Sequence, residues 1–276
     1  MEEQTMVIKT VTVKNLLTPS KLPDADFVIN PYIGCNHGCV YCYAGFMSRF
    51  TGHAGEKWGD FIDVKQCEKP LPQKTAGSSI LIGSVTDPYN PLEKRHEKTR
   101  DILRQLQNTQ AHLEILTKSP LVTRDIDILS RIKDVSVGIS LSSTDEQFSR
   151  LTERHAASPE RRLDAMRTLN DAGITVYAFI SPIFPFLSDW KRVADEAGKY
   201  AAYTCFENLN LRGAYKRDVL NLIARHYPKQ AEAFAGIYQN REQFTKYWRG
   251  VEKEIRSYMA RKPYRLYFFH EKIKKK

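Results

Sequence analysis

The stretch from residue 30 to residue 46 reads Asn-Pro-Tyr-Ile-Gly-Cys-Asn-His-Gly-Cys-Val-Tyr-Cys-Tyr-Ala-Gly-Phe, and the rest of the chain is interpreted from it. Three of the five cysteines lie here, Cys35, Cys39 and Cys42, in the spacing C-x3-C-x2-C. Thiolates are the ligands that iron–sulfur clusters select, and a cluster normally takes four of them. Three thiolates this close together can bind three irons of a [4Fe–4S] cluster and leave the fourth iron open. Gly34 and Gly38 allow the backbone to turn tightly around such a bulky group.

Two other interpretations of these cysteines stay open on spacing alone. His37 lies among them, and zinc accepts three Cys and one His in a tetrahedral site. Structural zinc sites usually take two ligand pairs from separate segments, however, and the sequence has no second C-x2-C pair. A disulfide framework is less favoured, because five cysteines cannot all pair and the polar start of the chain does not resemble a secretory signal. An open iron, by contrast, can chelate a small molecule through its amine and carboxylate.

Two blocks of sequence resemble one family. The pattern Asn-Pro-Tyr-x-Gly-Cys-x-His-x-Cys-x-Tyr-Cys-Tyr-Ala resembles the signature of the spore-photoproduct-lyase-like branch of the radical S-adenosylmethionine (SAM) superfamily. A second block, Gly83-Ser-Val-Thr-Asp-Pro-Tyr-Asn-Pro-Leu-Glu93, resembles the block that follows the second strand in that branch. The resemblance implies a [4Fe–4S] cluster on the three cysteines, reductive cleavage of SAM to a 5′-deoxyadenosyl radical, and hydrogen abstraction from a substrate.

The composition indicates a soluble globular protein, with 42% hydrophobic residues among 276. The longest apolar stretch, Val176 to Leu187, is too short to span a bilayer and contains two prolines. We therefore expect a cytoplasmic protein without a membrane partner. The formal charge of +10 favours nucleic acid, although much of the excess lies at 261–265 and 272–276, where a basic tail is more often simply solvated.

From residue 79 onward, apolar runs alternate with helical periodicity, which is typical of βα units around a parallel sheet. With the resemblance, this predicts an α/β fold: a partial (β/α)6 TIM-like barrel of the radical SAM type with a helical C-terminal extension. We divide the chain into a lead-in (1–24), the barrel (25–212) and a helical, basic extension (213–276). The barrel strands are expected at 27–30, 80–83, 112–116, 135–141, 174–180 and 203–209.

Outside these strands, two short β-segments are expected at 6–13 and 61–65. Helices are expected at 93–108, 121–132, from Pro159 to Gly173, 189–199, 213–226, 229–239 and 242–259. Pro159 after Ser158 suits a first helical position, and Gly173 suits a helix end.

The resemblance assigns SAM-binding residues to the ends of the strands, where barrel enzymes build their sites. Ser84, Thr86 and Asp87 follow the second strand, where the superfamily places groups that receive the SAM amine. A carboxylate and hydroxyl oxygens suit an ammonium group, although Asp87-Pro88 also reads as a simple turn. Lys118, after the third strand, is similar to the lysine of the family that binds the SAM carboxylate.

Further candidates come from the later strands and from the cysteine loop. Ser140 and Ser142 are assigned to the ribose hydroxyls, and Pro182 to a segment that lines the adenine pocket. Tyr41 and Tyr43 flank Cys42 and are candidates for a radical or proton relay, or for packing against the cluster.

One position departs from the family pattern. In spore photoproduct lyase the second block begins with a cysteine that donates a hydrogen atom to the product radical, and the matching residue here is Ser84. A serine O–H bond is much stronger than a thiol S–H bond, so we do not expect thymine-dimer repair. Cys205, on the expected sixth strand, is interpreted as a small buried hydrophobe. The sequence is more similar to other members of the branch, including the type called radical SAM mobile pair protein B, which is encoded beside a second radical SAM protein.

These observations lead to three hypotheses of function. The leading one is radical chemistry on nucleic acid or a nucleotide, with a reductant such as flavodoxin or ferredoxin and the second radical SAM protein as a further partner. The first alternative is radical modification of a protein or peptide partner. The second is a non-catalytic, zinc-stabilised nucleic-acid-binding module.

Overall fold

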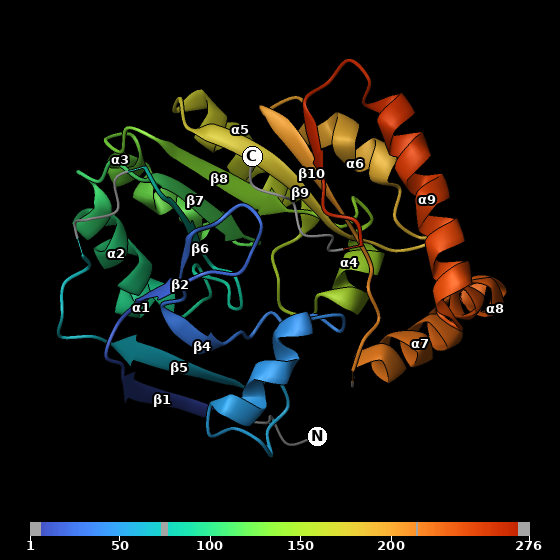
Figure 1. Ribbon diagram of the computed structural model, residues 1–276, viewed down its shortest axis with the longest axis horizontal. Helices are drawn as coiled ribbons and strands as arrows, with labels where there is room; N and C mark the ends of the chain where they lie inside the picture. Colours follow the sequence, from blue (N-terminus) through green and yellow to red (C-terminus); the bar gives the residue numbers. More distant parts are fainter. Residues whose placement is uncertain (1–6, 73–76, 214, 270–276) are drawn as a thin grey trace.

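The computed structural model describes residues 7–72, 77–213 and 215–269, and a parallel sheet lies at its centre (Figure 1). Six parallel strands pair in the order in which they occur in the chain. They are β3 (Phe27–Ile29), β6 (Ser79–Ile82), β7 (His112–Thr117), β8 (Val135–Ser140), β9 (Thr175–Ile183) and β10 (Tyr203–Asn208). This sheet, with helices between its strands, confirms the predicted fold class and all six predicted barrel strands.

Two further strands extend the sheet at its edges. β2 (Leu17–Pro19) pairs antiparallel with β3, and β11 (Tyr264–Leu266) pairs parallel with β10. The expectation of an entirely helical segment beyond residue 212 is therefore wrong, because the chain returns to the sheet and its backbone satisfies the outer edge of β10. The Tyr267 hydroxyl then donates a hydrogen bond to Asp24 at 2.5 Å, which links the segments beside the two sheet edges.

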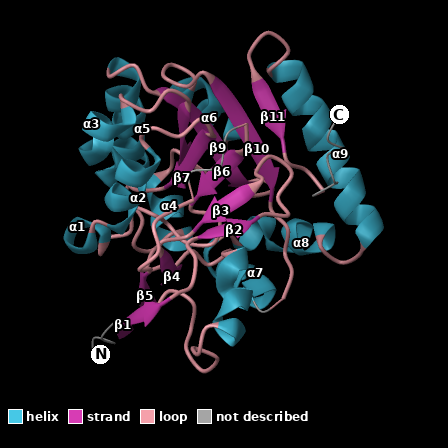
Figure 2. Cartoon of the chain, turned by 60° about the vertical axis from the view of Figure 1, so that its left-hand side comes forward, coloured by secondary structure: helices cyan, strands magenta, loops and turns pink. Residues whose placement is uncertain are grey.

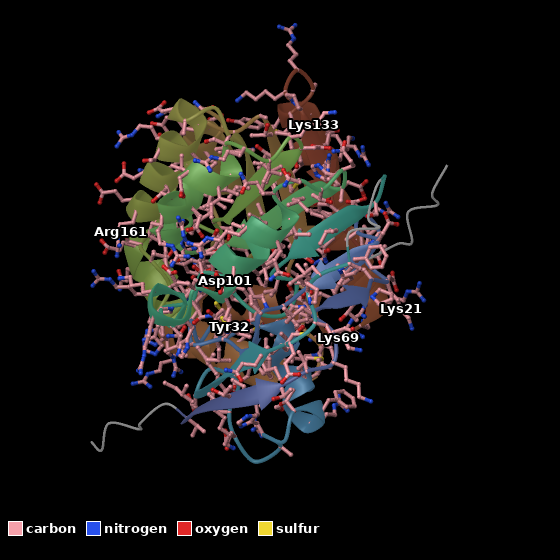
Figure 3. All side chains as sticks on the ribbon, turned by 90° about the vertical axis from the view of Figure 1, so that its left-hand side faces the viewer. Lys21, Tyr32, Lys69, Asp101, Lys133 and Arg161 are labelled. Carbon is pink, nitrogen blue, oxygen red and sulfur yellow. The ribbon has the colours of Figure 1, made fainter. Side chains whose placement is uncertain are left out.

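A second, three-stranded sheet supports the cysteine loop. It consists of β1 (Val7–Thr12), β5 (Phe61–Gln66) and β4 (Tyr32–Gly34), in the order β1-β5-β4. The short strands expected at 6–13 and 61–65 are confirmed within the described residues, whereas β4 was not expected. Tyr32, which is labelled in Figure 3, is 1% exposed and packs with Ile62 and Val64.

Helices cover the outside of the main sheet, as Figure 2 shows. Those between the strands are α1 (Glu93–His96), α2 (Lys98–Leu106), the 3-10 helix η2 (Pro120–Asp125), α3 (Ile126–Leu129), α4 (Glu146–Thr152), α5 (Pro159–Asp171) and α6 (Trp190–Ala197). After β10 follow α7 (Tyr215–His226), α8 (Pro228–Ile237) and α9 (Arg241–Tyr258), and the 3-10 helix η1 (Tyr43–Phe50) follows the cysteines. α5 has the predicted cap, since Ser158 accepts from the Arg161 N–H and Gly173 adopts a positive φ of 77°.

Two predicted helices differ from the observed ones. The helix expected at 93–108 is broken at Glu97, whose φ is 47°. The Glu93 carboxylate accepts hydrogen bonds from the backbone N–H groups of Thr99 and Arg100, and this contact starts α2 as a separate helix. The helix expected at 121–132 begins instead as η2, where Ser119 caps the first turn before Pro120.

Besides the small cluster around Tyr32, two large apolar clusters form the core. One joins the strands from β3 to β9 to α2, α3 and α5. The other joins β9 and β10 to the C-terminal helices, with Phe184, Phe206 and Trp248 among its buried residues. The C-terminal helices thus pack directly on the barrel strands. Within the described ranges, none of the helices combines the length and apolar character that crossing a lipid bilayer requires.

Candidate active site

A cavity of about 1940 Å³ lies beside the cysteine loop and the carboxyl ends of the barrel strands. Its wall includes eleven of the twelve residues that the sequence suggested for the site: Cys35, Cys39, Tyr41, Cys42, Tyr43, Ser84, Thr86, Asp87, Lys118, Ser140 and Pro182. Ser142 is not in the wall; it is fully buried behind it. The parallel strands bring these residues together because their carboxyl ends lie at one end of the barrel.

The backbone of the cysteine loop depends on glycine at two close approaches. At Gly34, φ is +86° and an added Cβ would lie 2.3 Å from the carbonyl oxygen of Phe61. At Gly59, φ is +116° and an added Cβ would lie 3.2 Å from the Cα of Gly38. The three cysteines are free thiols. Burial raises the pKa of Cys35 to about 12 and also raises the pKa of Cys39 and of Cys42. A cationic centre is the kind of group that would hold such thiols as thiolates.

Asp87 ties the second sequence block to the cysteine loop. Its Oδ2 lies 2.8 Å from His37 Nε2 and accepts from the Lys118 backbone N–H, while its Oδ1 accepts from the Thr117 hydroxyl and the Tyr89 N–H. Burial raises the pKa of Asp87, but His37 and these donors outweigh burial and lower the pKa to about 2. Both carboxylate oxygens are therefore engaged by the protein itself.

Other contacts join the same two blocks. The Thr86 hydroxyl donates to the carbonyl of Gly34, and the Tyr43 hydroxyl donates to the carbonyl of Ser84. Asn30, which sequence reasoning did not single out, accepts from the Val85 N–H at 3.0 Å and donates to Ser84 Oγ at 3.0 Å. Asn30 is the first residue of the stretch 30–46 that contains the cysteines, and this position could have marked it as a candidate.

A buried ionic network lies behind the cavity wall. Lys118 donates from Nζ to Ser140 Oγ at 2.7 Å and lies 3.9 Å from Glu153 Oε1. Glu153, at the end of α4, also accepts from Arg162 on α5 and from the hydroxyls of Tyr41 and Ser142. Burial raises the pKa of Glu153, but Arg162 and Lys118 outweigh it and hold the pKa below its ordinary value.

The network explains where Tyr41 and Ser142 point. Burial and the nearby Glu153 charge raise the pKa of Tyr41 well above its ordinary range, so its hydroxyl is a firm donor to that carboxylate. Sequence reasoning missed Glu153 and Arg162, because no local pattern links them to the cysteines.

Glu207 and Cys205 are among the residues of β10 that reach the cavity. Glu207 lies in the wall beside Pro182 and accepts from the Ser181 hydroxyl. Cys205 is buried, as expected for a small hydrophobe, but it also contributes to the cavity wall. Neither residue was among the candidates from the sequence.

The donor set suits an iron–sulfur cluster, because three free thiols of one short loop line the same cavity. Among the described residues, no three His, Cys, Asp or Glu side chains converge closely enough to hold one metal ion. A cubane binds each thiolate at a different iron and requires no such convergence. His37 Nε2 already contacts Asp87, so the Cys3His zinc site gains no support here.

Comparison with known proteins identifies the family. A family model described as the radical SAM superfamily matches residues 29–196, so the chain belongs to this superfamily. An uncharacterised protein of Methanocaldococcus jannaschii is 36% identical over 90% of this chain and 92% of its own length. One of Mycobacterium bovis is 26% identical over 80% of this chain and 71% of its own length.

Solved structures show the same fold. Spore photoproduct lyase complexed with dinucleoside spore photoproduct has a TM-score of 0.66 and 17% identity, covering 95% of this chain and 82% of that one. A mutant of that lyase with bound AdoMet and the same dinucleoside has a TM-score of 0.63 and 16% identity, with the same coverage. The chain is thus a radical SAM enzyme by family, and this family uses a [4Fe–4S] cluster, SAM and a reductant.

Proposed function

We propose that Cys35, Cys39 and Cys42 hold the [4Fe–4S] cluster, and that the cavity beside them binds SAM together with a nucleotide or a segment of nucleic acid. The observation that carries this proposal is the joint presence of three free thiols and Lys118 in the wall of one large cavity. When bound and reduced, the cluster supplies the electron that cleaves SAM to methionine and a 5′-deoxyadenosyl radical.

The chain's own residues then divide into binding and positioning groups. Lys118 carries a cation at the cavity wall, held by Ser140 and Glu153, and is suited to the SAM carboxylate. Ser84 and Pro182 lie in the same wall and stay candidates for SAM contacts. Asp87 and Thr86 use their oxygens within the protein, so we assign them to positioning the cysteine loop.

Tyr41 and Tyr43 also position the loop in this proposal. The Tyr41 hydroxyl is bound to Glu153 and the Tyr43 hydroxyl to the Ser84 carbonyl, so both anchor the segment around Cys42. Tyr43 is 53% exposed, and its ring is free to contact a bound molecule. Ser142 is better suited to supporting Glu153 than to binding ribose, because it is buried behind the wall.

The size of the cavity supports a second molecule beside SAM. Sites for one small ligand occupy about 300–1000 Å³, and the observed cavity has about 1940 Å³. Tyr43 and Phe46, both exposed, offer aromatic faces on which bases can stack, and Arg212 and Arg225 in the wall suit phosphates. A nucleotide or an unpaired base is therefore the substrate class that we favour.

The charge of the wall supports the alternative of a peptide substrate. Nine Lys and Arg residues face eight Asp and Glu residues around the cavity, so the excess positive charge of the chain is not concentrated there. Radical modification of a protein or peptide partner remains the second candidate for this reason. A cytoplasmic location and flavodoxin or ferredoxin as reductant remain predictions.

The first experiment is anaerobic reconstitution with iron and sulfide, followed by reduction with dithionite in the presence of SAM. Formation of 5′-deoxyadenosine by the wild type and not by Cys39→Ala is the expected result. Absence of a cluster in the wild type, with stoichiometric bound zinc, would refute the proposal.

A second experiment separates the two substrate classes. Binding of single-stranded DNA or RNA oligonucleotides is measured at a series of salt concentrations. Release of counterions predicts that affinity falls as salt rises. Absence of binding at low salt would remove a nucleic acid strand as the substrate and leave a free nucleotide or a peptide.

A further inference from the structure

We propose that the indole N–H of Trp58 donates a hydrogen bond to the cluster at its Cys42 corner and thereby sets the reduction potential of the cluster. This inference rests on the proposed assignment of the cluster to Cys35, Cys39 and Cys42. It concerns a residue that lies outside both sequence blocks and belongs to the loop between η1 and β5.

The main observation is an unmatched donor. Trp58 Nε1 is buried, and it has no hydrogen-bond partner among the described residues, although the rest of the side chain is partly exposed. Leaving a buried donor without an acceptor costs about 1–3 kcal/mol. Trp58 lines the same cavity as all three cysteines, so a sulfur atom of a bound cluster would supply the missing acceptor.

The surroundings of Cys42 show which corner the indole approaches. The 3-10 helix η1, which begins directly after Cys42, packs against Trp58 at Gly45. A Cβ added at Gly45 would lie 3.6 Å from the Cβ of Trp58, which is ordinary van der Waals contact and shows how close the two segments are. The indole therefore approaches the cluster site from the side of Cys42.

The indole of Trp58 packs against a buried pair of stacked rings, Phe61 and His53. The ring meets Phe61 edge-on with centroids 5.5 Å apart, and the opposite contact of Phe61 is a stack with His53 at 3.9 Å. His53 is 2% exposed and lies between two carboxylates, 2.5 Å from Glu56 and 2.9 Å from Asp63. These contacts position the indole before any cluster binds.

The next residue, Gly59, packs directly on the cysteine loop. An added Cβ there would lie 3.2 Å from Gly38 Cα and 3.9 Å from the carbonyl oxygen of Cys35. The loop from residue 51 to 60 is thus a wall of the cluster site, and His53 is the residue that positions this wall.

The consequence is electrostatic. Reduction adds negative charge to a cluster, and hydrogen-bond donors to its sulfur atoms stabilise that charge and raise the reduction potential. Removing the indole N–H should therefore make the cluster harder to reduce while leaving the three ligands in place.

The test compares Trp58→Phe with Trp248→Phe. Phenylalanine keeps an aromatic ring and removes the N–H. Trp248 is the matched control, because its Nε1 is also buried without a partner among the described residues, but it lies in the C-terminal core outside the cavity wall. Each protein is loaded with a cluster, iron and sulfide are counted, and the potential is measured by an EPR-monitored redox titration.

We expect a more negative potential in Trp58→Phe and an unchanged potential in Trp248→Phe, at equal iron content. Equal potentials in wild type and Trp58→Phe would overturn the inference and leave the proposed function intact. Failure of the wild type to assemble any cluster would instead remove the proposed function, and this inference with it.

A measurement on the wild type covers the case in which Trp58→Phe does not load. The protein is labelled with indole-15N tryptophan, and the reduced cluster is examined for hyperfine coupling to 15N. Coupling that persists in Trp248→Phe supports the hydrogen bond. No coupling in the labelled wild type would show that no tryptophan N–H reaches the cluster, and would overturn the inference.

Discussion

Glu153→Ala is the substitution that tests the buried network most directly. Glu153 and its partner Arg162 have side-chain exposures of 0% and 1%, so neither charge is solvated by water. Removing one partner of a buried ion pair costs about 3–5 kcal/mol, because the remaining charge is left uncompensated. Tyr41 loses its hydrogen-bond acceptor at the same time. We therefore expect Glu153→Ala to lower the free energy of unfolding by about 3–5 kcal/mol.

The assay is urea denaturation of the metal-free protein under anaerobic conditions, followed by circular dichroism. Glu146→Ala is the matched control, because Glu146 pairs with Arg150 at 2.6 Å on the surface, with exposures of 58% and 77%. An exposed pair of this kind contributes about 0.3–0.5 kcal/mol. Replacing Arg162 with Met in the Glu153→Ala background should recover part of the loss, since the unpaired charge is gone. A cost of Glu153→Ala no larger than that of Glu146→Ala would refute the reasoning.

Three further predictions concern other parts of the molecule. Lys118→Met should raise the dissociation constant for SAM by about ten- to a hundredfold in the cluster-loaded protein, because a charge-assisted hydrogen bond contributes about 1.5–3 kcal/mol. Titration calorimetry measures this constant, and an unchanged value would contradict the assignment of Lys118 to the SAM carboxylate. Gly34→Ala should destabilise the protein more than Gly52→Ala: both glycines have positive φ, which costs about 1–2 kcal/mol for alanine, but only Gly34 would place its Cβ 2.3 Å from a carbonyl oxygen. Equal costs in urea denaturation would show that the loop relaxes. Burial raises the pKa of Glu252, but Arg256 and Arg249 outweigh burial and hold that pKa below its ordinary value. The ionised Glu252 therefore stabilises the folded protein fully above the pKa of the unfolded state, and this stabilisation is lost as the pH falls through the pKa of the folded state. The stability difference between wild type and Glu252→Gln should shrink over that acidic range, and a constant difference would contradict the prediction.

The sequence by itself determined the family and the order of the barrel. The spacing of Cys35, Cys39 and Cys42 is local and favours a cluster, and the resemblance of two sequence blocks to the radical SAM superfamily pointed to the family. The alternation of apolar runs with helical periodicity located all six barrel strands, because strand and helix periods depend only on neighbouring residues. Ser158-Pro159 and Gly173 marked the ends of α5 for the same reason.

The sequence was less informative where a distant residue decides local structure. The helix expected at 93–108 is broken because the Glu93 carboxylate caps α2, and Arg124, 31 residues away, holds that carboxylate. β11 forms because β10 offers it a free edge, and nothing within residues 264–266 signals that partner.

The tertiary structure alone decided how the site residues are used. Asp87 meets His37 across 50 residues, and Tyr41 meets Glu153 across 112, so these side chains hold the loop in place. Ser142 was a candidate from the sequence, but it is buried behind the cavity wall. Trp58 was not a candidate, yet it lines the same cavity as the three cysteines. Local sequence patterns specify which residues can carry a cluster, whereas the direction of each side chain depends on packing between segments that are far apart in the chain.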